Sequence, residues 1–191
     1  MKQLFFDTET TGVPRNYKAP VSDVENWPRL VQLGYILYED GNEVLSQEHV
    51  IKPIGFVISD EVSKIHGITH QYASECGEDL LPVLNYFSEK VRLSDEIVGH
   101  NMSYDMNVIG AELVRARMSE IFVGRSTYDT MIHGTNLCKI PGLRAGSYKW
   151  PKLSELHQFL FNTPLEQTHT ALDDIRQTAK CYFEMKKRGV L

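Results

Sequence analysis

The hydrophobic positions of this chain follow the spacing of strands in its first part and mostly the spacing of helices afterwards. An apolar, Phe-rich run over residues 3–9 predicts a short strand. Residues 30–38 and 44–51 are also rich in β-forming residues, and the Glu-Asp-Gly-Asn sequence at 39–42 has the composition of a tight turn. These two runs therefore predict a β-hairpin.

Strands and helices alternate in the remainder of the chain. The predicted elements, in order, are a helix over 80–91 with Pro82 in its first turn, a buried strand over 96–98, a helix over 105–118, a short strand at 122–123, an irregular segment over 139–152, and helices over 153–161 and 171–187. Hairpin-connected strands followed by alternating strands and helices are typical of an α/β domain with a mixed sheet, antiparallel early and parallel later.

Length and composition indicate one domain. With 191 residues, of which 42% are hydrophobic, the chain has the apolar content for a sizeable core, and we expect a single domain over residues 1–191. Three cysteines, Cys76, Cys138 and Cys181, form no Cys-x-x-Cys pair, which argues against a disulfide framework and against a thiolate zinc site. No apolar stretch approaches the roughly 20 residues of a membrane span, and no signal-peptide pattern opens the chain. We expect a cytoplasmic protein with no membrane segment.

The charge balance is acidic, with 20 basic and 25 acidic residues and a formal net charge of −5. This balance excludes a protein that coats nucleic acid through a strongly positive surface. A local basic groove within an acidic molecule is still compatible with it.

The first candidate for chemistry is the acidic pair Asp7 and Glu9, at the end of the first predicted strand. Because side chains two residues apart on a strand point to the same face, these carboxylates project side by side. Neighbouring carboxylates repel each other unless a cation lies between them, and hard oxygen ligands suit Mg²⁺ or Mn²⁺. Taken alone, such a pair is more often a solvated strand end than a metal site.

A second candidate, Asp105, follows the strand predicted over 96–98 and the sequence Gly-His-Asn-Met-Ser-Tyr at 99–104. A strand that ends in a Gly-containing turn and enters a helix places polar residues where α/β folds build their sites. We expect Asp105 in the first helical turn, with Ser103 as the candidate N-cap. The alternative role of Asp105 is a favourable interaction with the helix dipole.

The third candidate is formed by His169 and Asp174, around the start of the last predicted helix. Thr170 and Asp173 have the spacing of a capping box, which starts the helix near Ala171 and leaves His169 in a loop. Asp174 then lies on a mostly apolar helix face, where a carboxylate needs a partner such as a metal ion.

Together, the three segments make a stronger case than any one of them. Four carboxylates, those of Asp7, Glu9, Asp105 and Asp174, could hold two metal ions about 3.5–4 Å apart. Such a pair activates a water molecule and stabilises the leaving oxygen in phosphodiester cleavage. A nearby histidine is a natural general base, because its pKa lies close to working pH.

Three segments of the sequence resemble the exonuclease motifs of the DEDD superfamily, in its His-containing branch. They are residues 5–12, Phe-Phe-Asp-Thr-Glu-Thr-Thr-Gly, together with 99–105 and 169–174, and their order and spacing match over residues 4–183. Residues 65–69, Ile-His-Gly-Ile-Thr, resemble the segment between the first two motifs of this superfamily, which includes the proofreading epsilon subunit of bacterial DNA polymerase III.

This resemblance implies a ribonuclease H-like fold, with a five-stranded mixed sheet flanked by helices. It implies that Asp7, Glu9, Asp105 and Asp174 bind two Mg²⁺ or Mn²⁺ ions and that His169 deprotonates the attacking water. The implied activity is 3′→5′ hydrolysis that releases nucleoside 5′-monophosphates.

The resemblance also implies contacts with the terminal nucleotide. Thr10, Thr11 and the region of Ile68 are expected to approach this nucleotide, and Asn101 is expected to line its pocket.

Two segments go beyond the usual pattern of the superfamily. Residues 14–28 contain Arg15, Tyr17, Lys18 and Trp27, and residues 139–152 contain Lys139, Arg144, Tyr148, Lys149 and Trp150. Basic residues interleaved with aromatic ones suit single-stranded nucleic acid. The alternative for 139–152 is a loop whose aromatic side chains pack on the core.

Other candidates are weaker. His66 and His70 are four residues apart, but Gly67 and two β-branched residues between them argue against a zinc-binding helical pair. Asp129 is either an additional site acid or, as we favour, a residue at a helix N-terminus. The basic run 186–188 either complements the dipole of the last helix or contacts a substrate phosphate.

We therefore expect a metal-dependent 3′→5′ exonuclease that acts on single-stranded or frayed 3′ ends, of DNA in the first place, alone or with a DNA polymerase partner. Two alternatives remain, an exoribonuclease that trims RNA ends and a nucleic-acid-binding module that keeps the fold without hydrolysis. The complete set of four acids with His169 argues against the second alternative.

Overall fold

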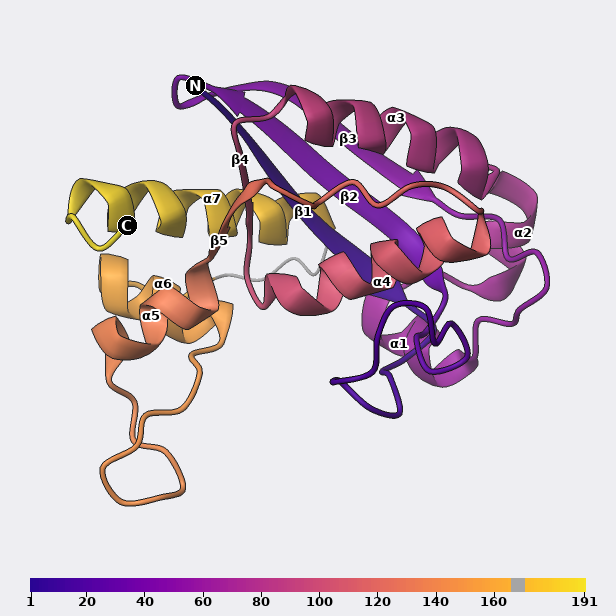
Figure 1. Cartoon of the computed structure of the whole chain (residues 1–191). Helices are drawn as coiled ribbons and strands as arrows, with labels where there is room; N and C mark the ends of the chain where they lie inside the picture. Colours follow the sequence, from indigo (N-terminus) through magenta and orange to yellow (C-terminus); the bar gives the residue numbers. More distant parts are fainter. Residues whose placement is uncertain (166–170) are drawn as a thin grey trace.

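The computed structural model describes residues 1–165 and 171–191 (Figure 1). Its strands are β1 (Lys2–Thr10), β2 (Leu30–Glu39), β3 (Asn42–Val50), β4 (Glu96–Gly99) and β5 (Ser126–Asp129). Its helices are α1 (Asp60–His66), α2 (His70–Cys76), α3 (Leu80–Leu93), α4 (Met102–Arg115), α5 (Thr130–Cys138), α6 (Leu153–Phe161) and α7 (Ala171–Lys187). None of the helices in these described ranges is long and apolar enough to cross a membrane.

The five strands form one mixed sheet in the order β3-β2-β1-β4-β5. The first three strands pair antiparallel, and β1, β4 and β5 pair in parallel. This arrangement confirms the predicted sheet, antiparallel early and parallel later. The central strand of the sheet is β1, and its large apolar residues, Leu4, Phe5 and Phe6, are buried there.

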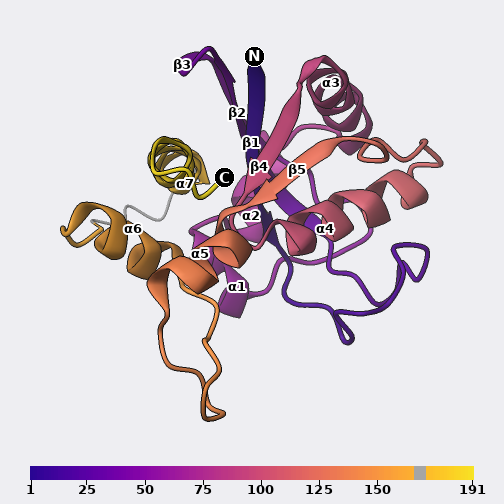
Figure 2. The ribbon, with the colours of Figure 1, turned by 60° about the vertical axis from the view of Figure 1, so that its left-hand side comes forward.

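Helices cover both faces of the sheet, and β1 is buried between them (Figure 2). Leu4 and Phe6 point into a core formed with α3 and α4 on one face, while Phe5 packs on the other face against Ile175 and Tyr182 of α7. Full burial of one such large side chain contributes about 1.5–3 kcal/mol. Because successive side chains of β1 point to opposite faces of the sheet, this strand packs against both helical layers.

Two predicted elements differ from the structure. No strand forms at residues 122–123, where the chain turns before β5. Phe122 is apolar because it packs in the core, with its ring stacked 5.8 Å from that of Phe6. Helix α4 begins at Met102 rather than at 105, so Ser103 lies inside the helix and the N-cap position belongs to Asn101, whose φ is 64°.

The basic run at the end of α7 has structural partners. The ammonium group of Lys186 lies 2.9 and 3.0 Å from the two carboxylate oxygens of Glu96, at the start of β4. The hydroxyl of Tyr182 donates to the same carboxylate, and Arg188 pairs with Glu184. Because Glu96 stands at the opposite end of β4 from Gly99, Lys186 is held away from the carboxyl end of the parallel strands.

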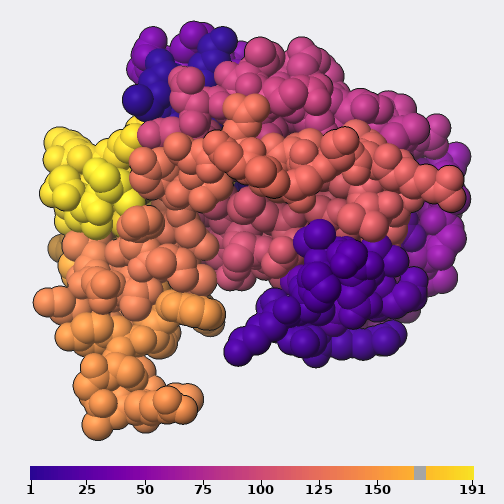
Figure 3. Space-filling model, viewed as in Figure 1, coloured from indigo at the N-terminus to yellow at the C-terminus, as the bar shows by residue number. Residues whose placement is uncertain are grey.

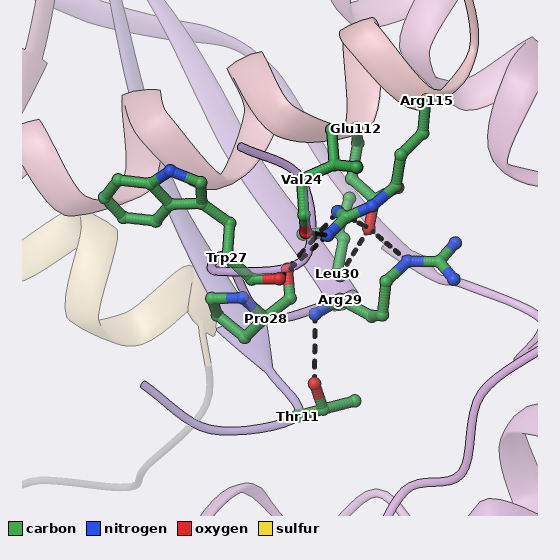
Figure 4. A network of polar contacts seen from close by, with 8 residues as sticks. All are labelled: Thr11, Val24, Trp27, Pro28, Arg29, Leu30, Glu112 and Arg115. Carbon is green, nitrogen blue, oxygen red and sulfur yellow. Dashed lines mark hydrogen bonds and ion pairs between the residues drawn. The ribbon is translucent and has the colours of Figure 1, made fainter. Parts of the chain in front are cut away.

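A buried ion cluster holds the long segment between β1 and β2 (Figure 4). One carboxylate oxygen of Glu112, on α4, accepts from the Arg29 side chain at 2.8 Å and from the Leu30 amide at 3.0 Å. The same oxygen lies 3.1 Å from Arg115, whose guanidinium also donates to the carbonyl groups of Val24 and Trp27. The side chain of Glu112 is 1% exposed.

This cluster gives a testable prediction for stability. Replacing Glu112→Ala leaves two partly buried guanidinium groups and one backbone amide without their shared acceptor, which is expected to cost about 3–5 kcal/mol in the free energy of unfolding. Urea denaturation measures the loss. The matched control is Glu39→Ala, which removes an exposed contact of 3.9 Å with Lys2 and is expected to change stability by about 1 kcal/mol or less. Equal effects of both variants would contradict the structural role of Glu112.

Candidate active site

The acidic residues of β1 lie where the sheet changes from antiparallel to parallel. On one side, β1 pairs with β2 along its whole length, with Asp7 opposite Gly34. On the other side, the parallel pairing with β4 covers only residues 3–5 of β1, after which β4 ends at Gly99. Asp7 and Glu9 therefore extend past the end of their parallel neighbour, at the kind of position where α/β sheets bind ligands.

Asp105 reaches the same strand from the first turn of α4, as predicted. One of its carboxylate oxygens accepts from the backbone amide of Thr8 at 3.0 Å and from the Thr8 hydroxyl at 2.6 Å. Asp105 is 4% exposed. These two hydrogen bonds fix the carboxylate of Asp105 beside the acidic pair of β1.

The start of α4 is held by Asp129, at the end of β5. Its two carboxylate oxygens accept from the amides of Asn101 at 3.0 Å and Met102 at 2.9 Å. Asp129 is also the N-cap of α5 and accepts from the amides of Met131 and Ile132. The predicted role of Asp129 at a helix N-terminus is confirmed, and it serves two helices at once. Asp129 thereby positions the turn of α4 that carries Asp105.

The first turns of α7 bring Asp174 to the same place. A Cβ atom at position 34 would lie 3.0 Å from the Ala171 Cβ and 3.0 Å from the Ile175 Cδ1, so glycine permits this close approach of α7 to β2. Because Gly34 pairs with Asp7, the approach sets the start of α7 over the acidic end of β1. Asp7 and Asp174 line one cavity, together with Phe5, Phe6, His100, Leu153, Ile175 and Thr178.

The pKa values of these acids are shifted by burial and by the charges of their neighbours. Burial raises the pKa of Asp7 well above its usual range, and the charges of Asp105, Glu9 and Asp174 raise it further. Burial and the charge of Asp174 raise the pKa of Glu9 to about 7. Burial raises the pKa of Asp105 to about 7, although the two hydrogen bonds from Thr8 favour its charged form. The four predicted acids are thus one interacting group.

This group is compatible with a cation but is not preformed as a site. Mutual repulsion among buried and partly buried carboxylates is the condition that a divalent cation relieves, and carboxylate oxygens are ligands for Mg²⁺ and Mn²⁺. Within residues 1–165 and 171–191, no three His, Cys, Asp or Glu side chains are arranged closely enough to hold a metal ion. Two predicted residues, His169 and Thr170, lie outside the described residues, so the general base and the capping box stay predictions.

A second cavity has Glu9 in its lining. Its lining comes from the end of β1, the segment after it, α1 and the start of α4, and comprises Thr8, Glu9, Thr10, Gly12, Val13, Tyr17, Val62, Ile65, His66, Asn101 and Tyr104. Two of the predicted nucleotide contacts, Thr10 and Asn101, are in this lining. The other two are not, since Thr11 accepts from the Arg29 amide and Ile68 is buried against Val31, Ile58 and Ala73.

His66 is a lining residue that the sequence did not single out for this role. Its Nδ1 accepts from the Ile68 amide at 3.1 Å, so the neutral ring carries its proton on Nε2. Nε2 is buried, and among the described residues it has no hydrogen-bond partner. His70 lies on another helix, with its Nδ1 3.4 Å from the Ile58 amide, so the two histidines form no helical zinc pair.

Comparisons of the sequence with known proteins point to a family of nucleases. The family model described as Exonuclease matches residues 4–182. A DNA polymerase III of the PolC type from Pediococcus pentosaceus is 27% identical over 188 residues, which are 97% of this chain and 11% of that protein. The chain therefore spans about a tenth of the length of this relative.

Solved structures share the fold at low sequence identity. E. coli exonuclease I in complex with a dT13 oligonucleotide superimposes with a TM-score of 0.75 at 19% identity, over 98% of this chain and 41% of that one. Exonuclease X in complex with 5′ overhanging duplex DNA gives a TM-score of 0.62 at 21% identity, over 98% and 93% of the two chains. The sheet and its flanking helices are thus the ribonuclease H-like fold, and the chain belongs to the exonuclease family, as its resemblance to the DEDD superfamily implied.

Proposed function

We propose that this protein is a metal-dependent 3′→5′ exonuclease that acts on single-stranded or frayed DNA ends and releases nucleoside 5′-monophosphates. The observation that carries the proposal is the gathering of Asp7, Glu9, Asp105 and Asp174 around the end of β1, where burial and the neighbouring carboxylates raise the pKa of the first three. Residues 1–191 act as a single exonuclease domain in this proposal.

The four acids would hold two Mg²⁺ or Mn²⁺ ions. When bound, such a pair of ions activates a water molecule and stabilises the leaving oxygen. The chain itself supplies the fixed frame, because Thr8 orients Asp105 and the Gly34 contact sets the start of α7. His169, five residues before Asp174, would accept the proton of the attacking water, and this role rests on the motif spacing.

The cavity beside Glu9 has the properties of a pocket for the 3′-terminal nucleotide. The rings of Tyr17 and Tyr104 lie 6.4 Å apart at its wall, and aromatic faces suit a nucleobase. Burial raises the pKa of Tyr104 to about 12, so its hydroxyl stays protonated at neutral pH and donates to the Gly12 carbonyl at 2.8 Å. Nε2 of His66, which has no hydrogen-bond partner among the described residues, would offer one hydrogen-bond donor to the nucleotide.

DNA is the proposed substrate because the relatives point to it. The PolC-type relative is a DNA polymerase, and the exonuclease I and exonuclease X structures hold DNA. A DNA polymerase is accordingly the proposed protein partner.

The direct test is hydrolysis of a single-stranded oligonucleotide with Mg²⁺ or Mn²⁺. With a label on the 3′-terminal phosphodiester, we expect labelled nucleoside 5′-monophosphate as the first product, and a 3′-phosphorothioate linkage is expected to delay it. A parallel RNA strand of the same sequence tests the sugar preference. Release of mononucleotides from the 5′ end first, or from neither DNA nor RNA, would refute the proposal.

Asp174 and Asp173 provide a matched pair of variants. Asp174→Asn removes a proposed metal ligand, and kcat is expected to fall by about 10²-fold or more, on the scale seen when one group that stabilises a transition state is lost. Asp173→Asn removes a charge that lies 3.7 Å from Arg176 on the helix surface, and its effect is expected in stability only, at about 0.3–1 kcal/mol. The reverse result would show that the wrong member of the pair is assigned to the site.

His169 is tested by its own variant. If it is the general base, His169→Ala is expected to lower kcat by about 10²–10⁴-fold with Mg²⁺ saturating. The acidic limb of the pH profile, which reports loss of the neutral imidazole, is expected to disappear in the variant. His157→Ala, on α6, is the control histidine, and an equal loss of kcat in both would remove the assignment.

The stability of the metal-free protein is expected to depend on pH through the acidic group. A carboxyl whose folded-state pKa is raised favours folding while it is protonated, and this contribution is lost as the pH rises through the raised value. The pKa values of Glu9 and Asp105, each about 7 instead of their ordinary 4.5 and 3.8, place the loss between about pH 4 and pH 7.

We therefore expect a lower Tm at pH 8 than at pH 5 in EDTA, and a larger increase on adding Mg²⁺ at pH 8 than at pH 5. Glu9→Gln, which is neutral at both pH values, is expected to reduce both differences. A Mg²⁺ effect that is the same at the two pH values and in the variant would contradict the site.

A further inference from the structure

Residues 139–150, which we call the arm, leave the body of the molecule between α5 and α6 (Figures 1 and 3). The arm doubles back on itself, because the Lys149 amide donates to the Ile140 carbonyl at 2.9 Å and the Gly142 amide donates to the Ser147 carbonyl at 2.8 Å. In Figure 3 a hollow separates the arm from the segment that follows β1. The arm is thus a defined projection beside a concave surface.

Large apolar side chains of the arm face solvent. Trp150 is 63% exposed and Tyr148 is 44% exposed, and Leu143 at the tip is fully exposed. The alternative that these aromatic residues pack on the core is therefore wrong for both rings. The other tryptophan, Trp27, is 3% exposed, and its indole N–H donates to the Pro20 carbonyl.

The charges of the arm and its base are all positive. Residues 139–152 contain Lys139, Arg144, Lys149 and Lys152 and no acidic residue, in a chain with a formal net charge of −5. Exposed aromatic rings among cations are the combination that single-stranded nucleic acid needs, because bases stack on rings and phosphates need neutralisation.

The base of the arm is connected to the acidic site. The Pro151 carbonyl lies 3.1 Å from Nε2 of His100, whose Nδ1 lies 2.9 Å from the Thr130 hydroxyl. His100 and Leu153 line the cavity that also contains Asp7 and Asp174. A strand whose 3′ end lies at the carboxylates would therefore have the base of the arm, at Pro151, next to a residue of the same cavity.

We propose that the arm binds the single strand upstream of its 3′-terminal nucleotide, with bases stacked on Tyr148 and Trp150 and phosphates near Lys139 and Arg144. The proposal rests on the exonuclease function proposed above. It adds a second contact region, which long substrates reach and dinucleotides do not.

Trp150 allows stacking to be observed directly, because the chain has only two tryptophans and Trp27 is buried. Titration of the full chain with a dT12 strand in EDTA is expected to quench about half of the tryptophan emission in a saturable manner. Trp150→Phe is expected to abolish the quenching while a 5′-fluorescein dT12 still binds, as measured by anisotropy. Quenching that persists in Trp150→Phe, or binding without any quenching in the wild-type chain, would overturn the proposal.

Substrate length gives the second test. In the double variant Tyr148→Ala and Trp150→Ala, we expect KM for a 12-mer to rise about 5- to 100-fold and KM for a dinucleotide to stay within twofold. Tyr86→Ala is the matched control, since Tyr86 on α3 is also about 40% exposed beside a cation, Lys90, at 4.1 Å. Its KM is expected to be unchanged for both substrates.

The outcomes separate the two proposals. If the wild-type chain hydrolyses no substrate, the exonuclease proposal fails, and quenching in EDTA still reports on the arm. If the double variant binds and degrades the 12-mer as the wild-type chain does, the proposal for the arm is refuted and a protein becomes the better candidate for this surface.

Discussion

The whole arrangement depends on the unequal neighbours of β1. On one side, β2 accompanies β1 over its full length, whereas on the other side β4 pairs with residues 3–5 only. Leu4, Phe5 and Phe6 are buried by α3, α4 and α7 and supply the large core residues of β1, whereas Asp7 and Glu9, beyond the end of β4, are only partly buried. Core and candidate site are thus two consecutive parts of one strand, and neither can shift in register without the other.

The four acids repel one another, and residues outside this group hold them together. Gly34 lets α7 approach β2, and Asp129 fixes the start of α4 through the amides of Asn101 and Met102. The hydrophobic packing of α4 and α7 offsets the electrostatic cost that appears in the raised pKa values of Asp7, Glu9 and Asp105. The frame makes these carboxylates neighbours, and the cation proposed for them would relieve the repulsion that remains.

Local periodicity was sufficient to predict much of this structure. The two-residue period placed Asp7 and Glu9 on one face, and the spacing of apolar residues gave the helices at 153–161 and 171–187 their observed bounds. The predictions were wrong where contacts between residues distant in the sequence determine the local structure. Phe122 resembles a strand residue because the core buries it, and α4 begins earlier than predicted because Asp129, 27 residues beyond Met102, binds its first amides. Gly34 has no local signal at all, since its role appears only when α7 lies across β2.

The acidic candidate site and the basic segment 139–152 are separate parts of the molecule, and together they would suit a polyanion bound at one end. An acidic surface alone would repel the phosphates that the carboxylates must approach, so cations are needed there, and bound metal ions would supply them only at the scissile position. Upstream phosphates would need another source of positive charge. Residues 139–152 contain four basic side chains, of which Lys149 is paired with Glu155 at 2.6 Å, and the segment meets the cavity through the contact of Pro151 with His100. Because these charges are few, the function proposed above would use them over a short footprint at a strand end. Binding along a long duplex would instead require the extended positive surface that a net charge of −5 argues against.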